Sequence, residues 1–146
     1  MKSLLSHWLK LVAFVLIFAL ISNSKVFPMG TKRYEIYIPE DFSDTEAEFR
    51  DLIKQHAHYF EGYVMADYRG DARYTYQSDS FEVTEVWYEK GDNAGSFEFE
   101  VDVQYFEGCK DRNYLDQESR TAEFSLDKSK KCLVFELDET VWNPDN

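Results

Sequence analysis

Hydrophobic and polar residues alternate along much of the chain after residue 80, as expected for half-buried β-strands. Two alternating runs flank a predicted turn at 91–95. If Lys90 pairs with Ser96, the two runs bury one common face. This core face would carry Phe81, Val83, Glu85, Trp87, Glu89, Phe97, Phe99, Val101, Val103 and Tyr105.

The opposite face of this predicted hairpin is acidic. The same register places there Glu82, Val86, Tyr88, Glu98, Glu100 and Asp102. One aliphatic and one aromatic side chain would then be surrounded by carboxylates. Because the other face already buries the apolar side chains, folding does not require these acids, and we interpret this face as a candidate partner-binding surface.

A further hairpin is predicted from residues 121–127 and 132–138. Phe124 would face Phe135 in its core. On its outer face Glu123 would lie directly against Glu136, a like-charge pair that costs about 1 kcal/mol or less. A cost without structural benefit can indicate function, so both glutamates join the candidate partner-binding residues. The open alternative is that solvent and a neighbouring lysine screen the pair.

Before these hairpins the pattern has a helical period. Residues 43–46, Ser-Asp-Thr-Glu, match the capping box S-x-x-E that begins a helix. Apolar residues then recur at spacings of three and four up to Phe60, which predicts one stripe that packs on a sheet and a helix that ends at Gly62. The flanking segments are predicted to be a strand, 33–38, and a tyrosine-rich hairpin, 63–77.

These elements predict an α+β fold, with one N-terminal amphipathic helix packed on a curved antiparallel β-meander. Cys109 and Cys132 are the two cysteines of the chain. In an oxidising compartment they would form one disulfide, which would tie a polar loop, 107–120, to the last strand. On the chain-entropy account this link would contribute roughly 3.5 kcal/mol to stability.

Residues 1–24 predict export. Lys2 and Lys10 precede eleven apolar residues, 11–21, and the small-x-small sequence Ser-Asn-Ser at 22–24 follows, which is the order of a cleavable signal peptide. The uncharged run, residues 11–24, is about 21 Å long as a helix, which is shorter than the roughly 30 Å hydrocarbon core of a membrane. If Lys10 reaches the interface, residues 4–24 could instead form an uncleaved N-terminal membrane anchor. A buried helix without a targeting role is the third alternative. In the first two cases, residues 25–146 form one exported domain, periplasmic or secreted.

The chain is strongly acidic, with a net charge of −12. Residues 1–24 contain two lysines and no acid, so residues 25–146 carry 14 basic and 28 acidic side chains, net −14. This charge argues against nucleic acid as a partner, because phosphate contacts need positive charge. It favours a basic protein or a cation, and an acidic surface that only maintains solubility is the open alternative.

The sequence has no motif that names a reaction. It lacks the G-x-S-x-G nucleophile turn, the phosphate-binding loop and the dinucleotide-binding glycine pattern. We therefore expect no catalytic activity, no cofactor and no metal site. The order of a helix and then an antiparallel meander, over residues 43–138, is similar to cystatin-like and NTF2-like domains. That resemblance implies a helix on a bent sheet, and it assigns no residues because the Gln-x-Val-x-Gly loop of cystatin inhibitors is missing.

The sequence as a whole favours an exported acidic binding protein that neutralises a basic protein partner, such as an immunity protein that inhibits a toxin. One alternative is a small-molecule or carbohydrate binding module that uses the tyrosine-rich hairpin and a cavity under the sheet. A second is a carboxylate-based hydrolase, in which Glu85 and Glu89 would be desolvated on the apolar face.

Overall fold

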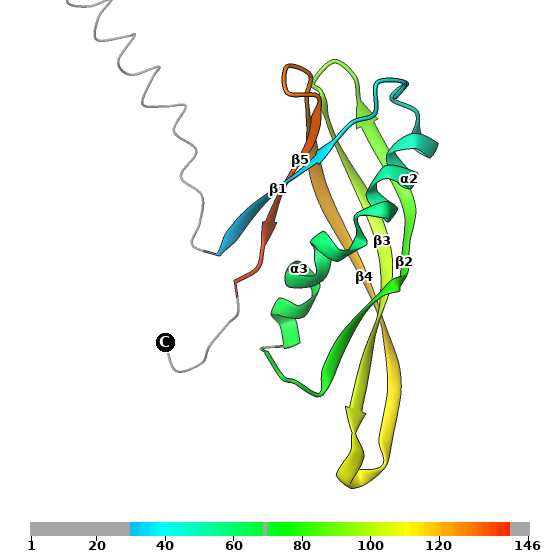
Figure 1. Cartoon of the computed structure of the whole chain (residues 1–146), viewed down its shortest axis with the longest axis vertical. Coiled ribbons are helices and arrows are strands. Elements are labelled where there is room, and N and C mark those ends of the chain that lie inside the picture. Colours follow the sequence, from blue (N-terminus) through cyan, green and yellow to red (C-terminus); the bar gives the residue numbers. More distant parts are fainter. Residues whose placement is uncertain (1–29, 69, 141–146) are drawn as a thin grey trace, which may run out of the picture.

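The main element of the structure, a computed structural model that describes residues 30–140 except Arg69, is one five-stranded antiparallel sheet (Figure 1). Its strand order is β1-β5-β4-β3-β2. The strands are β1 Thr31–Tyr37, β2 Tyr74–Glu89, β3 Ala94–Glu107, β4 Arg112–Asp127 and β5 Cys132–Asp138. Strands β2 to β5 follow one another as a meander, and β1 is added beside β5.

A helical segment connects β1 to β2 and covers one face of the sheet (Figure 1). It consists of α2 Glu46–Gln55, the 3-10 turn η1 Ala57–Phe60, α3 Glu61–Met65 and the 3-10 turn η2 Ala66–Tyr68. The N-cap of α2 is Thr45, whose side chain accepts a hydrogen bond from the Glu48 N–H at 3.3 Å. The Glu48 carboxylate in turn accepts from the Ser43 N–H at 2.7 Å, so the cap lies two residues later than predicted.

The predicted fold class is wrong. The described chain is mostly antiparallel sheet, its helices are two short pieces instead of one amphipathic helix up to Phe60, and it contains no disulfide. The α-helical stretch ends at Gln55 and is followed by 3-10 turns. The predicted signal peptide or anchor, 1–24, lies outside the described residues. Among the residues that are described, no helix is long and apolar enough to span a membrane.

The hairpin predicted for residues 63–77 is also wrong, because helical structure continues to Tyr68. Tyrosine side chains hold this segment against the sheet. The Tyr63 hydroxyl donates to the Thr121 carbonyl at 2.9 Å, and the Tyr76 hydroxyl of β2 donates to the Ala57 carbonyl at 2.6 Å. Tyr68 donates to the Glu118 carboxylate. These tertiary bonds override the strand preference of the tyrosine-rich sequence.

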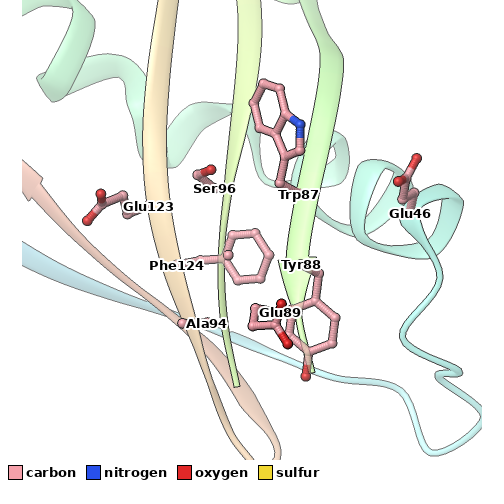
Figure 2. Close-up of a pocket in the computed structure, with 9 residues that line it drawn as sticks. Glu46, Trp87, Tyr88, Glu89, Ala94, Ser96, Glu123 and Phe124 are labelled. Carbon is pink, nitrogen blue, oxygen red and sulfur yellow. The ribbon is translucent and has the colours of Figure 1, made fainter. Parts of the chain in front are cut away.

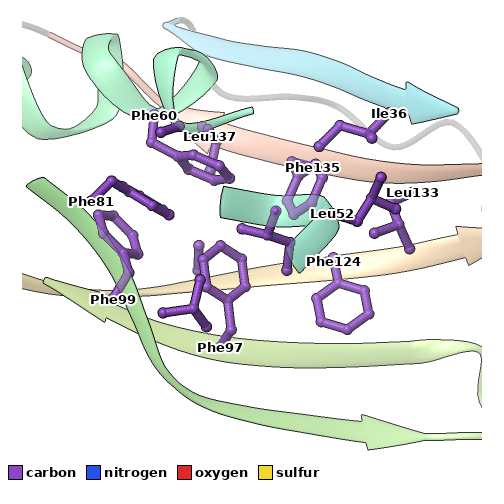
Figure 3. Close-up of a cluster of buried hydrophobic side chains, with 14 of the residues drawn as sticks. Ile36, Leu52, Phe60, Phe81, Phe97, Phe99, Phe124, Leu133, Phe135 and Leu137 are labelled. Carbon is purple, nitrogen blue, oxygen red and sulfur yellow. The ribbon is translucent and has the colours of Figure 1, made fainter. Parts of the chain in front are cut away.

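The core lies between the helical segment and the inner face of the sheet, and phenylalanine is its most frequent residue (Figure 3). Phe60 of η1 is at its centre. Its ring centroid lies 5.3–5.5 Å from those of four other rings, which are Phe81, Phe97, Phe99 and Phe135. Burial of each such ring stabilises the fold by roughly 1.5–3 kcal/mol. The predicted pair Phe124 and Phe135 is confirmed in the β4–β5 register.

The predicted disulfide is wrong because β4 is much longer than expected. The supposed polar loop, 107–120, is mostly strand, so Cys109 lies in the short turn η3, Gly108–Lys110, at the far end of the β3–β4 hairpin. Cys132 begins β5 at the other end of β4. Sixteen strand residues separate the two ends, roughly 50 Å at 3.3 Å per residue, whereas a disulfide needs Cα atoms within about 7 Å. Both thiols are free.

Candidate functional site

One face of the sheet packs on the helical segment, and the face that points away from it is covered by no described element. We call this second surface the outer face. It is strongly acidic and carries Glu82, Glu85, Trp87, Glu89, Ser96, Glu98, Glu100, Asp102, Glu123 and Glu136. Most of these side chains come from β2 and β3, whose alternation was the clearest signal in the sequence.

The structure places the predicted acidic residues together. Glu98, Glu100 and Asp102 follow one another on the outward positions of β3, between the buried Phe97, Phe99, Val101 and Val103. Glu82 of β2 faces Glu100. Glu123 and Glu136 line one small hollow on neighbouring strands, so the predicted proximity of these two glutamates is present as well.

Val86 and Tyr88 do not point out from this face, where the sequence pattern had placed them, although Tyr88 is only partly buried and lines a hollow beside Trp87. Val86 is 3% exposed and belongs to the core. The ring centroid of Tyr88 lies 4.7 Å from that of Phe49 in α2. Burial, and to a smaller extent the nearby carboxylate of Asp44, raises the pKa of the Tyr88 phenol. The cause is a β-bulge: Val83 faces Phe99, Glu85 faces Glu98, and Thr84 between them has no partner.

The bulge brings Trp87 to the outer face, where the sequence pattern had not placed it. Its side chain is 46% exposed and lies opposite Ser96. A signal for this arrangement was present in the sequence. The predicted register put Glu85 and Glu89 on the core face, and charged residues are almost never fully buried without a partner. A shift of the inward–outward alternation of β2 by one residue after Val83 turns Glu85, Glu89 and Trp87 toward solvent.

A hollow of about 640 Å³ lies beside Trp87 (Figure 2). The small residues Ala94, Gly95 and Ser96 of β3 line it together with Trp87, Tyr88 and Phe124. Gly95 is required there, because a Cβ atom would lie 2.3 Å from the Trp87 carbonyl oxygen and 2.6 Å from the Phe124 ring. On the side of the indole, the short side chains of Ala94 and Ser96 leave space open next to Trp87.

Carboxylates surround this hollow. Figure 2 shows Trp87 on β2, between Glu46 on the helix at one side and Glu123 on β4 at the other, and Glu89 also lines the space. A second hollow of about 250 Å³ shares Ala94, Glu123 and Phe124 and extends to Glu136 on β5. An aromatic face beside several carboxylates is a suitable environment for a lysine or arginine side chain, which can stack on the indole and form charge-assisted hydrogen bonds.

The acids next to the hollow repel one another. Glu85 lies directly opposite Glu98, and Glu82 opposite Glu100. Each such like-charge pair is destabilising by up to about 1 kcal/mol. Lys54 of α2 compensates Glu82, with Nζ 2.5 Å from Oε1. Within the described chain, Glu85, Glu98 and Glu100 make no ion pair, so the β2–β3 part of the outer face has an excess of negative charge.

The described residues do not assemble the ligand site or the hydrolase site that the sequence left open as alternatives. The tyrosines of segment 63–77 bond internally instead of lining a ligand site. Glu85 and Glu89 are exposed, so they do not form the desolvated pair expected for a hydrolase. Among residues 30–140 without Arg69, no group of three or more histidine, cysteine or acidic side chains is placed to hold a metal ion.

Comparison of the chain with protein-family models, with curated proteins and with solved structures found no match. The likeness to cystatin-like and NTF2-like domains therefore stays a likeness in element order and carries no argument about function. What the protein does has to be inferred from the outer face itself.

Proposed function

We propose that the protein is an exported binding domain that holds a basic protein partner against the outer face of its sheet. The observation that carries this proposal is the exposed Trp87 in a hollow lined by carboxylates. Its anchor would be an arginine or lysine of the partner stacked on the indole, with Glu89 and Glu123 as acceptors. The acid row of β3 next to this hollow would steer the partner and fix its orientation.

Neutralisation of a basic toxin is the specific form of this function that we favour. An inhibitor of this kind benefits from fast association, which a surface of one charge sign provides. The net charge of −14 for residues 25–146 and the export signal predicted for residues 1–24 both support it. The rigid sheet also supports it, because its binding residues are held on strands and need no ordering before they bind.

The test uses a short peptide of alternating arginine and glycine as the probe for a basic surface. We expect it to bind the wild-type protein with an affinity that falls steeply as salt is added. Replacing Trp87 with Ala should remove the stacked contact and cost on the order of 2 kcal/mol, about 30-fold in Kd. Isothermal titration calorimetry over a range of salt concentrations measures both quantities.

A pair of matched charge variants separates the outer face from general acidity. The first replaces Glu98 and Glu100 with Gln and Asp102 with Asn. The second makes the same change of three charges at Glu40, Asp41 and Asp51, which are exposed and lie outside the outer face. Only the first should weaken binding and flatten its salt dependence. Equal losses in the two variants, or full binding by Trp87→Ala, would contradict the proposed function.

A further inference from the structure

The sheet ends at two edges, β1 and β2, and these edges are built differently. The β2 edge is interrupted by two bulges, and Arg50 of α2 reaches it, with Nη2 3.5 Å from the Thr84 carbonyl oxygen. Bulges and covering helices are features that keep an edge from pairing with another chain. In contrast, all seven residues of β1 pair with β5 in one unbroken register, and no described element pairs with its other side.

The backbone groups on that free side can be identified from the ladder. The Ile38 N–H donates to the Lys131 carbonyl at 2.9 Å, and the Gly30 carbonyl accepts from the Glu139 N–H at 3.0 Å. Hydrogen-bonded pairs alternate along an antiparallel ladder, so the even-numbered residues from 30 to 38 bond to β5. The N–H and C=O groups of the odd-numbered residues point to the free edge. These residues are Thr31, Arg33, Glu35 and Tyr37.

The charges of these four residues are self-complementary. Arg33 and Glu35 lie one position on either side of Tyr34. If two copies of β1 pair antiparallel around a twofold axis at Tyr34, each Arg33 faces the Glu35 of the second copy, and each Thr31 faces Tyr37. The neighbouring twofold registers, centred on Arg33 or on Glu35, would instead place two like charges opposite each other. Charge therefore selects one register.

We propose that the protein forms a twofold-symmetric dimer by antiparallel pairing of β1 with β1 of a second copy. The four outward residues of each strand would form four hydrogen-bonded residue pairs, which join two five-stranded sheets into one continuous sheet. Tyr37, which is 78% exposed, would gain a cross-strand neighbour in Thr31. Within one chain Arg33 lies 3.1 Å from Glu35 and 3.8 Å from Glu136, contacts that are partly exposed and free to rearrange.

Sedimentation velocity of the purified protein over a range of concentrations tests this dimer. We expect the wild type to have twice the mass of the chain measured in denaturant. Arg33→Glu and Glu35→Arg should each raise the dissociation constant of the dimer by about ten-fold or more, because each places two like-charge pairs at the interface. At concentrations where the wild type is a dimer, both variants should then be mainly monomeric.

A mixture of these two variants should form a heterodimer. The glutamate introduced at position 33 of one chain then faces the arginine introduced at position 35 of the other, and the second cross-strand pair keeps its native Arg33 and Glu35. Both pairs of the interface are therefore of opposite charge again. This rescue also shows that neither variant is misfolded.

Two further variants act as controls. Glu100→Arg makes the same charge change on β3, outside the β1 edge, and should leave the dimer unchanged. Glu35→Pro removes an N–H that points to the free edge, so it should abolish the dimer while circular dichroism shows a folded sheet. The proposal is overturned if the wild type stays monomeric at the highest soluble concentration. It is equally overturned if both single charge reversals dimerise like the wild type, or if Glu100→Arg is as disruptive as they are.

Discussion

Thr84 determines the direction of the side chains that follow it in β2. As the unpaired residue between Val83 and Glu85, it shifts the alternation by one position. Val86 and Tyr88 consequently point into the core, and Trp87 points to the outer face. One extra residue in the strand thus produces the exposed indole on which the proposed function depends.

Replacing Trp87 and Tyr88 separately with Ala tests this direction. Tyr88→Ala should lower the free energy of unfolding by about 2 kcal/mol, because it removes the ring that packs on Phe49 and Phe124. Trp87→Ala should cost less than about 1 kcal/mol, since its side chain is half exposed. Urea unfolding followed by circular dichroism measures both. A larger loss for Trp87→Ala would contradict the assigned faces.

At the scale of single residues, the sequence predicted the direction of the side chains well in β3 and only in part in β2. The outward positions of Glu98, Glu100 and Asp102 followed directly from uninterrupted alternation in β3. The bulge in β2 could not be located, because an extra residue in a strand needs no glycine and leaves the apolar content of the segment unchanged. Glu85 and Glu89 on a supposed core face were the one available indication.

At the scale of elements, the long β3–β4 hairpin differs most from expectation. Its end projects beyond the helical segment (Figure 1). From Arg112 to Thr121 both sides of β4 meet solvent, although its partner strand β3 still buries Val101, Val103 and Tyr105. This part of β4 therefore has no buried alternation, and its sequence resembles a polar loop. Aromatic contacts support the strand instead: Tyr105 and Tyr114 stack with ring centroids 4.8 Å apart.

The length of this hairpin predicts the behaviour of the two thiols. Cys109 is exposed at its end and should react at once with a thiol reagent in the native protein. Cys132 is fully buried, and burial raises the pKa of its thiol, so it should react on the order of 1,000-fold more slowly, through opening of the fold. Labelling followed by mass spectrometry measures both rates.

Denaturant provides the control for this measurement, because unfolding should make the two cysteines equally reactive. Native-source protein that shows no reactive thiol before reduction and two after it would contradict the assignment of two free cysteines. Such a result would require β4 to be shorter than the structure has it, since a strand of sixteen residues keeps the two sulfurs far apart.

At the scale of the whole molecule, the sheet separates two environments. Phenylalanine rings and the helical segment occupy one face, and carboxylates occupy the other. The sequence predicted this separation, because alternation in β3 and the net negative charge are both visible without a structure. It could not predict the hollow beside Trp87, which depends on the bulge in β2 and on the small residues Ala94 and Ser96 of a different strand.

The central claim is that the outer face around Trp87 is the binding surface. Chemical-shift mapping on isotope-labelled protein, titrated with the arginine–glycine peptide, tests it most directly. We expect the largest shifts at the Trp87 indole N–H and at the amides of Ala94, Gly95, Ser96 and Glu98, with much smaller shifts in α3 and in α2 beyond Glu46, which lines the hollow. Shifts concentrated in the helical segment, or spread evenly over all acidic residues, would contradict the account.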